Sequence, residues 1–251
     1  MEYLWLFLSF FLVAALYASA GFGGGSSYLA LLALSGLPTG AIRPIALVCN
    51  LVVTGGSSLT YARAGVTPWR RALPLVVASM PAAFLGGRVQ LPRQQYLLML
   101  GGLLLLAAVL MLWQRTGVKE VEALGRRRGA GAVAVGIGTI VGFLSGVAGI
   151  GGGIFLSPIL FLSRWDGARA IAATTSLFIV LNSVAGLAGQ FSVGVDLDIS
   201  LTLLLTVAVA GGGYLGTHLT LHRFPPAVIR KVAALLILLV GLRLVWSNWV
   251  F

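Results

Sequence analysis

Two glycine-rich stretches are the residues of this chain most suited to binding chemistry. Residues 19–27 read SAGFGGGSS and residues 148–153 read AGIGGG, each between apolar runs. Glycine disfavours helix, so we expect both stretches to interrupt helices. Where a helix restarts, its first N–H groups lack partners and its dipole is positive, which suits an anion. Neither stretch is a nucleotide-binding loop, because no Gly-Lys-Ser/Thr sequence follows it.

Hydroxyl and amide side chains lie within or after each stretch and can donate hydrogen bonds to an anion. In the first half of the chain the candidate substrate-binding residues are Gly21, Gly23, Gly24, Gly25, Ser26, Ser27, Asn50 and Thr54. In the second half they are Gly149, Gly151, Gly152, Gly153, Thr174, Thr175, Ser176 and Asn182. We expect a positive φ at Gly24 and Gly152. Two alternatives stay open: the glycines serve helix packing alone, and the polar side chains bond to their own or neighbouring helices.

The ionisable residues argue against catalysis. All six acidic residues lie at predicted segment ends or in loops, so no carboxylate pair or relay is expected inside an apolar segment. One cysteine (Cys49) and two histidines are too few for a disulfide or a cluster of Cys or His ligands. No Ser-His-Asp set is present either. We predict that the protein is not an enzyme and holds no metal or cofactor.

The elements that position these residues are membrane-spanning helices. The chain is 59% hydrophobic and 9% charged, against about a quarter charged in soluble domains. Its apolar units are long enough to cross a ~30 Å hydrocarbon core. The eight units are 3–35, 41–62, 72–90, 95–114, 131–163, 168–190, 199–221 and 227–249. The net charge of +11 comes from basic residues between these units, which predicts a lipid bilayer as partner and no nucleic acid.

The two halves of the chain are related by an internal repeat. Between residues 20–35 and 148–163, 8 of 16 aligned positions are identical. We therefore predict a first transmembrane repeat over 1–117, a charged cytoplasmic linker over 118–128 and a second transmembrane repeat over 129–251. The first apolar unit of each half contains the glycine stretch. At 33 residues, that unit is too long for one ordinary helical span, because such a helix would reach ~50 Å.

The distribution of basic residues predicts that each interrupted unit is a hairpin. If both units re-emerge on the side they entered, 13 of the 17 Lys and Arg lie on one side of the membrane and four on the other. The four are Arg43, Arg88, Arg93 and Arg243. Three full crossings per half then make the repeats inverted, with six crossings in all and both termini outside the cytoplasm. Arg43, near a segment end, is expected to extend to the membrane interface.

The chain resembles the TauE/SafE sulfite-exporter family over nearly its whole length. The resemblance rests on GFGGGSSYLALLALSGLPTGAIRPIALVCN (21–50), on GVAGIGGGIFLSPILFL (146–162) and on GARAIAATTSLFIVLNSVAG (167–186). It implies a multi-pass protein of the bacterial inner membrane that moves sulfite or a small organosulfur or organosulfonate anion. Together with the glycine stretches, it predicts a secondary transporter, an exporter by the family's description, that binds its substrate between two hairpin tips. An anion channel on the same scaffold is the alternative.

Overall fold

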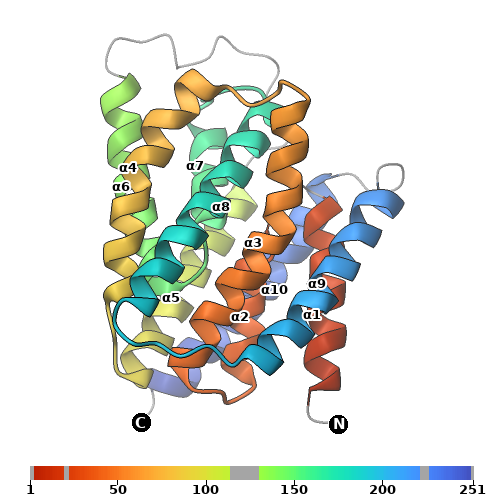
Figure 1. Cartoon of the computed structure of the whole chain (residues 1–251), viewed down its shortest axis with the longest axis vertical. Helices are drawn as coiled ribbons and strands as arrows, with labels where there is room; N and C mark the ends of the chain where they lie inside the picture. The colour runs from red at the N-terminus through yellow and green to blue at the C-terminus, as the bar shows by residue number, and fades with distance from the viewer. Residues whose placement is uncertain (1–2, 20–22, 114–129, 221–225, 250–251) are drawn as a thin grey trace.

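Ten helices make up the described part of the chain, which in the computed structural model covers residues 3–19, 23–113, 130–220 and 226–249 (Figure 1). The first half contains α1 (Leu4–Ser19), α2 (Gly25–Leu34), α3 (Thr39–Arg63), α4 (Trp69–Arg88) and α5 (Arg93–Trp113). The second contains α6 (Ala130–Ala148), α7 (Gly153–Leu162), α8 (Ala168–Phe191), α9 (Ile199–Thr220) and α10 (Pro226–Trp249). The all-helical architecture is confirmed for these residues. The linker predicted over 118–128 lies outside them.

Both glycine stretches break a helix, as expected. The predicted unit 3–35 contains α1 and α2, and the unit 131–163 contains α6 and α7. At the second break, the N–H groups of Gly149 and Ile150 both donate to the carbonyl of Ser145, at 2.8 and 3.2 Å, and Gly149 has φ +79°. This is the usual termination of a helix by a left-handed glycine. At the first break, Gly21 lies outside the described residues.

Six helices are long and apolar enough to cross a membrane, namely α3, α5, α6, α8, α9 and α10. The prediction of several spanning helices is therefore confirmed. The set differs from the six expected crossings, because it includes α6, expected as one arm of a hairpin, and lacks α4. Helix α4 is missing from it, since its sequence WRRALPLVVASMPAAFLGGR contains three arginines and two prolines. That helix packs against both α6 and α8, so neighbouring protein covers much of its surface. Twenty residues of helix still reach about 30 Å.

Helix packing follows the same pattern in both halves. The main pairs are α4 with α6, α1 with α9, α5 with α10, α4 with α8, α3 with α8 and α3 with α9. If α1–α5 are exchanged with α6–α10 in order, α4–α6 becomes α9–α1 and α4–α8 becomes α9–α3. The pairs α5–α10 and α3–α8 map onto themselves. The internal repeat in the sequence thus has a counterpart in the packing.

Stripes of glycine allow the helix axes of two equivalent pairs to approach closely. A Cβ at Gly138, Gly142 or Gly146 of α6 would meet a main-chain carbonyl of α4 at 2.5 Å or less. On α9, a Cβ at Gly212 or Gly216 would similarly meet a carbonyl of α1. Small residues four positions apart commonly bring membrane helices together in this way. Packing is therefore the role of these glycines, in contrast to those at the helix breaks.

Hydrogen bonds identify the elements that meet at each end of the bundle. At one end, called the Arg71 end, Arg71 at the start of α4 pairs with Asp166 before α8 at 2.8 Å. At the other, called the Arg43 end, Gln90 after α4 donates to the carbonyl of Val193 after α8. Gln94 at the start of α5 also donates to the carbonyl of Asn248 at the end of α10, so α5 and α10 run antiparallel. The start of α1 and the end of α10 lie at the lower end of Figure 1.

Candidate functional site

The two helix breaks meet at Asn50, a buried residue near the middle of α3. We call residues 23–25 the first tip and residues 149–153 the second tip. The side-chain oxygen of Asn50 accepts a hydrogen bond from the N–H of Gly25 in the first tip at 3.2 Å. Its amide nitrogen donates to the carbonyl of Ile150 in the second tip at 2.8 Å. One side chain therefore joins both tips across the interface between the halves.

The second tip presents a run of unpaired backbone donors. Within the described part of the chain, the N–H groups of residues 151–154 have no hydrogen-bond partner. The next two N–H groups, of Phe155 and Leu156, both donate to the carbonyl of Gly152. The unpaired groups are buried at the start of α7, with φ +79° at Gly151 and +86° at Gly152. Successive free N–H groups at a helix N-terminus form a concave site suited to an anion.

Hydroxyl groups surround the same tip. A Cβ at Gly151 would lie 3.0 Å from Ser183 Oγ, and one at Gly152 would lie 3.2 Å from Ser145 Oγ. Thr175 contacts the tip through its methyl group, 3.2 Å from a Cβ placed at Gly153. All three hydroxyls are buried and have no partner among the described residues. Because a hydroxyl hydrogen can rotate, these groups are available as donors to a bound anion.

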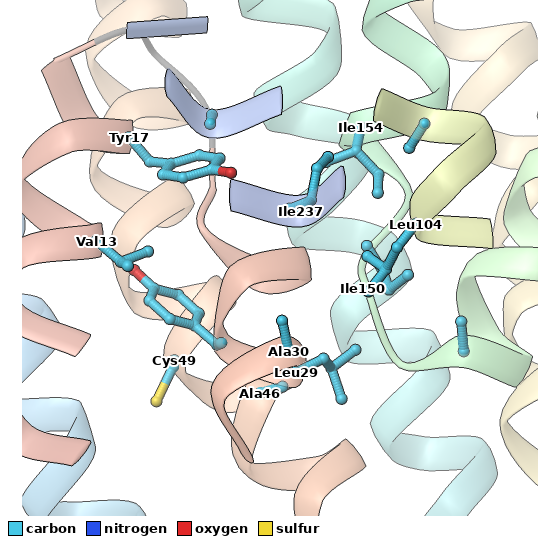
Figure 2. Close-up of a cluster of buried hydrophobic side chains, with 14 of the residues drawn as sticks. Val13, Tyr17, Leu29, Ala30, Ala46, Cys49, Leu104, Ile150, Ile154 and Ile237 are labelled. Atoms are coloured by element: carbon cyan, nitrogen blue, oxygen red, sulfur yellow. The ribbon is translucent and has the colours of Figure 1, made fainter. Parts of the chain in front are cut away.

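The space between the tips is small and closed. A cavity of about 10 Å³ lies there, lined by residues that include Tyr17, Gly23, Ile150, Gly153 and Ser157. That volume is about the space of one water molecule. In Figure 2, Tyr17 of α1 lies on one side of this region, with Ile150 of the second tip and Ile154 of α7 on the other and Ile237 of α10 between them. In this arrangement the space between the tips is too small for an anion with its hydration shell.

The first tip differs from the second in backbone geometry. The expectation of a positive φ is met at Gly152 but is wrong at Gly24, where φ is −83°. Gly24 caps α2 in an ordinary conformation, and the space beside it is what limits the side chain. A Cβ there would lie 2.6 Å from the ring of Tyr28.

Serines follow this tip on α2. Ser27 Oγ is 2.8 Å from the hydroxyl of Tyr17, whereas Ser26 Oγ is buried without a partner among the described residues.

Several predicted site residues bond elsewhere. The hydroxyls of Thr54 and Ser176 donate to carbonyls of their own helices, those of Asn50 and Ala173. Asn182 donates to Ser79 Oγ on α4 and to the carbonyl of Phe178, each at 2.8 Å. Its contacts thus join α8 to α4 rather than reaching the tips. Thr174 is fully buried, and its hydroxyl has no partner among the described residues.

Arg43 and Tyr96 hold the second tip from outside. The sequence analysis placed Arg43 at the membrane interface and did not single out Tyr96. The interfacial position expected for Arg43 is wrong, since this residue is only 5% exposed. Its guanidinium donates to the carbonyl of Gly146, just before the tip, at 3.0 Å. The hydroxyl of Tyr96 donates to the carbonyl of Ala148 at 2.8 Å. With Asn50, these side chains bind alternate carbonyls of residues 146–150. An arginine at the third position of the apolar unit 41–62 was the signal in the sequence.

Comparisons with known proteins agree with this architecture. The family model described as "Sulfite exporter TauE/SafE" matches residues 6–244. A "Probable membrane transporter protein y4hK" of Sinorhizobium fredii is 34% identical over 248 residues, which cover 98% of this chain and 99% of the relative. A "Probable membrane transporter protein" of Xylella fastidiosa is 27% identical over 241 residues, 90% of this chain and 89% of the relative. No solved structure matches significantly. The chain is a multi-pass membrane transporter that belongs to the TauE/SafE sulfite exporter family.

Proposed function

We propose that the protein is a secondary transporter that exports sulfite or a short organosulfonate, bound at the second tip where it meets the first. The observation that carries the proposal is the run of four unpaired N–H groups at residues 151–154. These donors favour a negative group with several oxygens. The sulfur and the direction of transport are taken from the family description.

The surroundings of the tip suit transient binding of an anion. The hydroxyls of Ser145, Thr175 and Ser183 add donors without adding a full charge. No Lys or Arg is among the described residues lining the cavity between the tips, so release need not break an ion pair. These described residues include no carboxylate that would repel an anion. A site with hydroxyl and N–H donors and without a charged side chain in its described lining supports transport rather than catalysis as its role.

We infer that the two halves are inverted repeats and that the site opens alternately to the two sides. Support comes from the matching helix pairs and from the antiparallel arrangement of the equivalent helices α5 and α10. Inverted repeats with broken helices are a common plan of secondary transporters. The cavity of about 10 Å³ favours a carrier over an open channel, because a hydrated ion needs more space. We place the protein in the bacterial inner membrane with both termini outside.

The test is uptake by proteoliposomes that contain the purified protein. The panel comprises sulfite, methanesulfonate, sulfoacetate, phosphate and nitrate, with potassium as a cation control, each with and without a proton gradient. We expect saturable transport of sulfite or a sulfonate and none of potassium. Empty liposomes and liposomes with the Gly152→Val variant are the controls. Transport of the cation without any oxyanion would contradict the proposal.

A further inference from the structure

A second cavity, much larger than the one between the tips, opens at the Arg43 end. Its volume is about 450 Å³, and its lining includes Thr39, Arg43, Gln90, Tyr96 and Asp196. We call it the vestibule. It lies where the start of α3, the end of α4, the start of α5 and the loop after α8 come together. Its size is sufficient for a small organic anion with several water molecules.

The vestibule contains a buried cation without a counter-ion. The guanidinium of Arg43 donates to the carbonyls of Val89 at 3.0 Å, Gly87 at 3.3 Å and Gly146 at 3.0 Å. It also stacks near Tyr96, with its Cζ 5.8 Å from the ring centroid. Among the described residues, the one ion pair is between Arg71 and Asp166 at the opposite end. The groups that contact this charge are therefore carbonyl dipoles at the ends of α4 and α6 and the ring of Tyr96.

The hydrogen-bonding capacity of Arg43 is not exhausted. Its Nε is buried and has no partner among the described residues. A guanidinium carries five N–H donors in a planar fork, of which the three bonds above use three. Two N–H donors are thus unused, of which the one on Nε is buried, and the positive charge belongs to a residue that lines a water-accessible space. This combination is suited to a carboxylate, sulfonate or similar oxyanion.

Two residues of the vestibule lining also hold the second tip. A Cβ at Gly149 would lie 3.1 Å from Arg43 Cβ, and both Arg43 and Tyr96 bind carbonyls of residues 146–148. Arg43 and Tyr96 therefore connect the vestibule to the segment that carries the unpaired N–H groups. An anion held by Arg43 would contact a residue that positions the substrate site.

We propose that the vestibule is a second anion subsite, in which Arg43 holds a small sulfonate or related oxyanion at the Arg43 end of the transport path. The proposal rests on the proposed function, because it places this subsite on the exit side of the path of the same exported substrate. Asp196, exposed and also in the lining, opposes the accumulation of anions and so weakens the subsite. Replacing this carboxylate should strengthen it.

Cysteine modification tests the electrostatics without requiring transport. Gly40 lines the vestibule, and a Cβ there meets nothing within 4 Å, so Gly40→Cys should be tolerated. The assay uses purified protein in a Cys49→Ala background and compares the sulfonate-bearing reagent 2-sulfonatoethyl methanethiosulfonate with its trimethylammonium analogue. The matched control is Ser192→Cys, exposed at the same end outside the vestibule lining.

We expect the ratio of anionic to cationic reaction rates to be about tenfold higher at Gly40→Cys than at Ser192→Cys. Arg43→Lys should retain this preference, Arg43→Gln should abolish it, and Asp196→Asn should increase it. Equal ratios at the two cysteines would overturn the proposal.

A second measurement keeps Arg43 intact, in case Arg43→Gln does not fold. Methanesulfonate should slow the reaction of Gly40→Cys with neutral N-ethylmaleimide in a saturable manner at constant ionic strength, and should leave Ser192→Cys unaffected. Absence of protection would also overturn the proposal. Charge selectivity and protection without any oxyanion transport in liposomes would reject the proposed function and leave the subsite standing. Oxyanion transport without charge selectivity and protection would reject the subsite and leave the proposed function standing.

Discussion

At the scale of single residues, the glycines of the two tips exclude side chains for different reasons. Gly152 has φ +86°, and a Cβ there would lie 2.7 Å from the ring of Phe178. Gly24 has an ordinary φ, and its Cβ would collide with Tyr28. Backbone strain thus acts at the second tip and steric exclusion at both. The sequence predicted that both stretches exclude side chains, but it could not show that strain acts at Gly152 and steric exclusion alone at Gly24.

Replacing Gly152 with valine should abolish transport while inserted protein remains. A left-handed backbone costs an ordinary residue about 1–2 kcal/mol, and the contact with Phe178 adds to this. The measurement is uptake of sulfite or methanesulfonate per amount of reconstituted protein. Gly36→Val is the matched control, because Gly36 has φ +79° with nothing within 4 Å of its Cβ. Normal transport by both variants would mean that the second tip does not approach the substrate.

Asn50 and Asn182 provide a paired test of the contact between the tips. Asn50→Leu leaves the N–H of Gly25 and the carbonyl of Ile150 unpaired, at about 1–3 kcal/mol for each buried group. Asn182→Leu breaks a comparable bond to Ser79 on α4, away from the tips. Both variants should lose thermal stability in detergent, but Asn50→Leu alone should lose most of its transport rate. Equal losses of transport would assign both asparagines a purely structural role.

At the scale of elements, the sequence analysis predicted the features that local patterns determine and missed the contacts between segments far apart in the chain. The breaks between α1 and α2 and between α6 and α7 were predictable, because clustered glycines interrupt a helix wherever they occur. The bonds that fix the second tip join residues about a hundred positions apart, such as Asn50 with Ile150 and Arg43 with Gly146. Only the packing of α3 against the second half creates them. The roles of Tyr96 and Ser145 could not be predicted for the same reason, and the position of Arg43 in an apolar unit did not show which residues it binds.

The orientation of the elements gives a prediction for accessibility from each side of the membrane. Gly167, at the Arg71 end, is exposed, and its Cβ would meet nothing within 4 Å. In a Cys49→Ala background, Gly167→Cys and a cysteine in the linker 118–128 should react with an impermeant maleimide only from the cytoplasmic side. Ser192→Cys, at the Arg43 end, should react only from outside. The charge distribution of 13 to 4 is the physical reason. The reverse labelling pattern would contradict the topology.

At the scale of the whole molecule, a symmetric arrangement of helices carries asymmetric chemistry. At the shift of 128 residues that relates 20–35 to 148–163, Ile171 lies opposite Arg43 and Phe178 opposite Asn50. These two polar side chains, which bind carbonyls of residues 146 and 150, therefore have apolar counterparts. We infer that the second tip is the fixed part of the substrate site.

The distribution of acidic residues over the whole molecule gives the last prediction. All six lie outside the interior of the predicted apolar segments, so proton coupling has no carboxylate relay to use. They are Glu2, Glu120, Glu122, Asp166, Asp196 and Asp198. Transport driven by a proton gradient should survive the replacement of each one by its amide. Asp166→Asn breaks the bond to Arg71, but this pair is partly exposed and its loss should cost at most about 1 kcal/mol.

The measurement is the rate of sulfite or methanesulfonate uptake, with and without the gradient, for each variant at equal reconstituted amount. If coupling acts through protonation of the substrate itself, all six variants keep the response of the uptake rate to the gradient. Asp196→Asn reaches this response at a lower substrate concentration, because a carboxylate that weakens the vestibule subsite is removed. One acidic residue whose replacement removes the response in correctly inserted protein would instead identify a protein-borne proton site. In that case the neutral interior proposed for the two tips would be wrong.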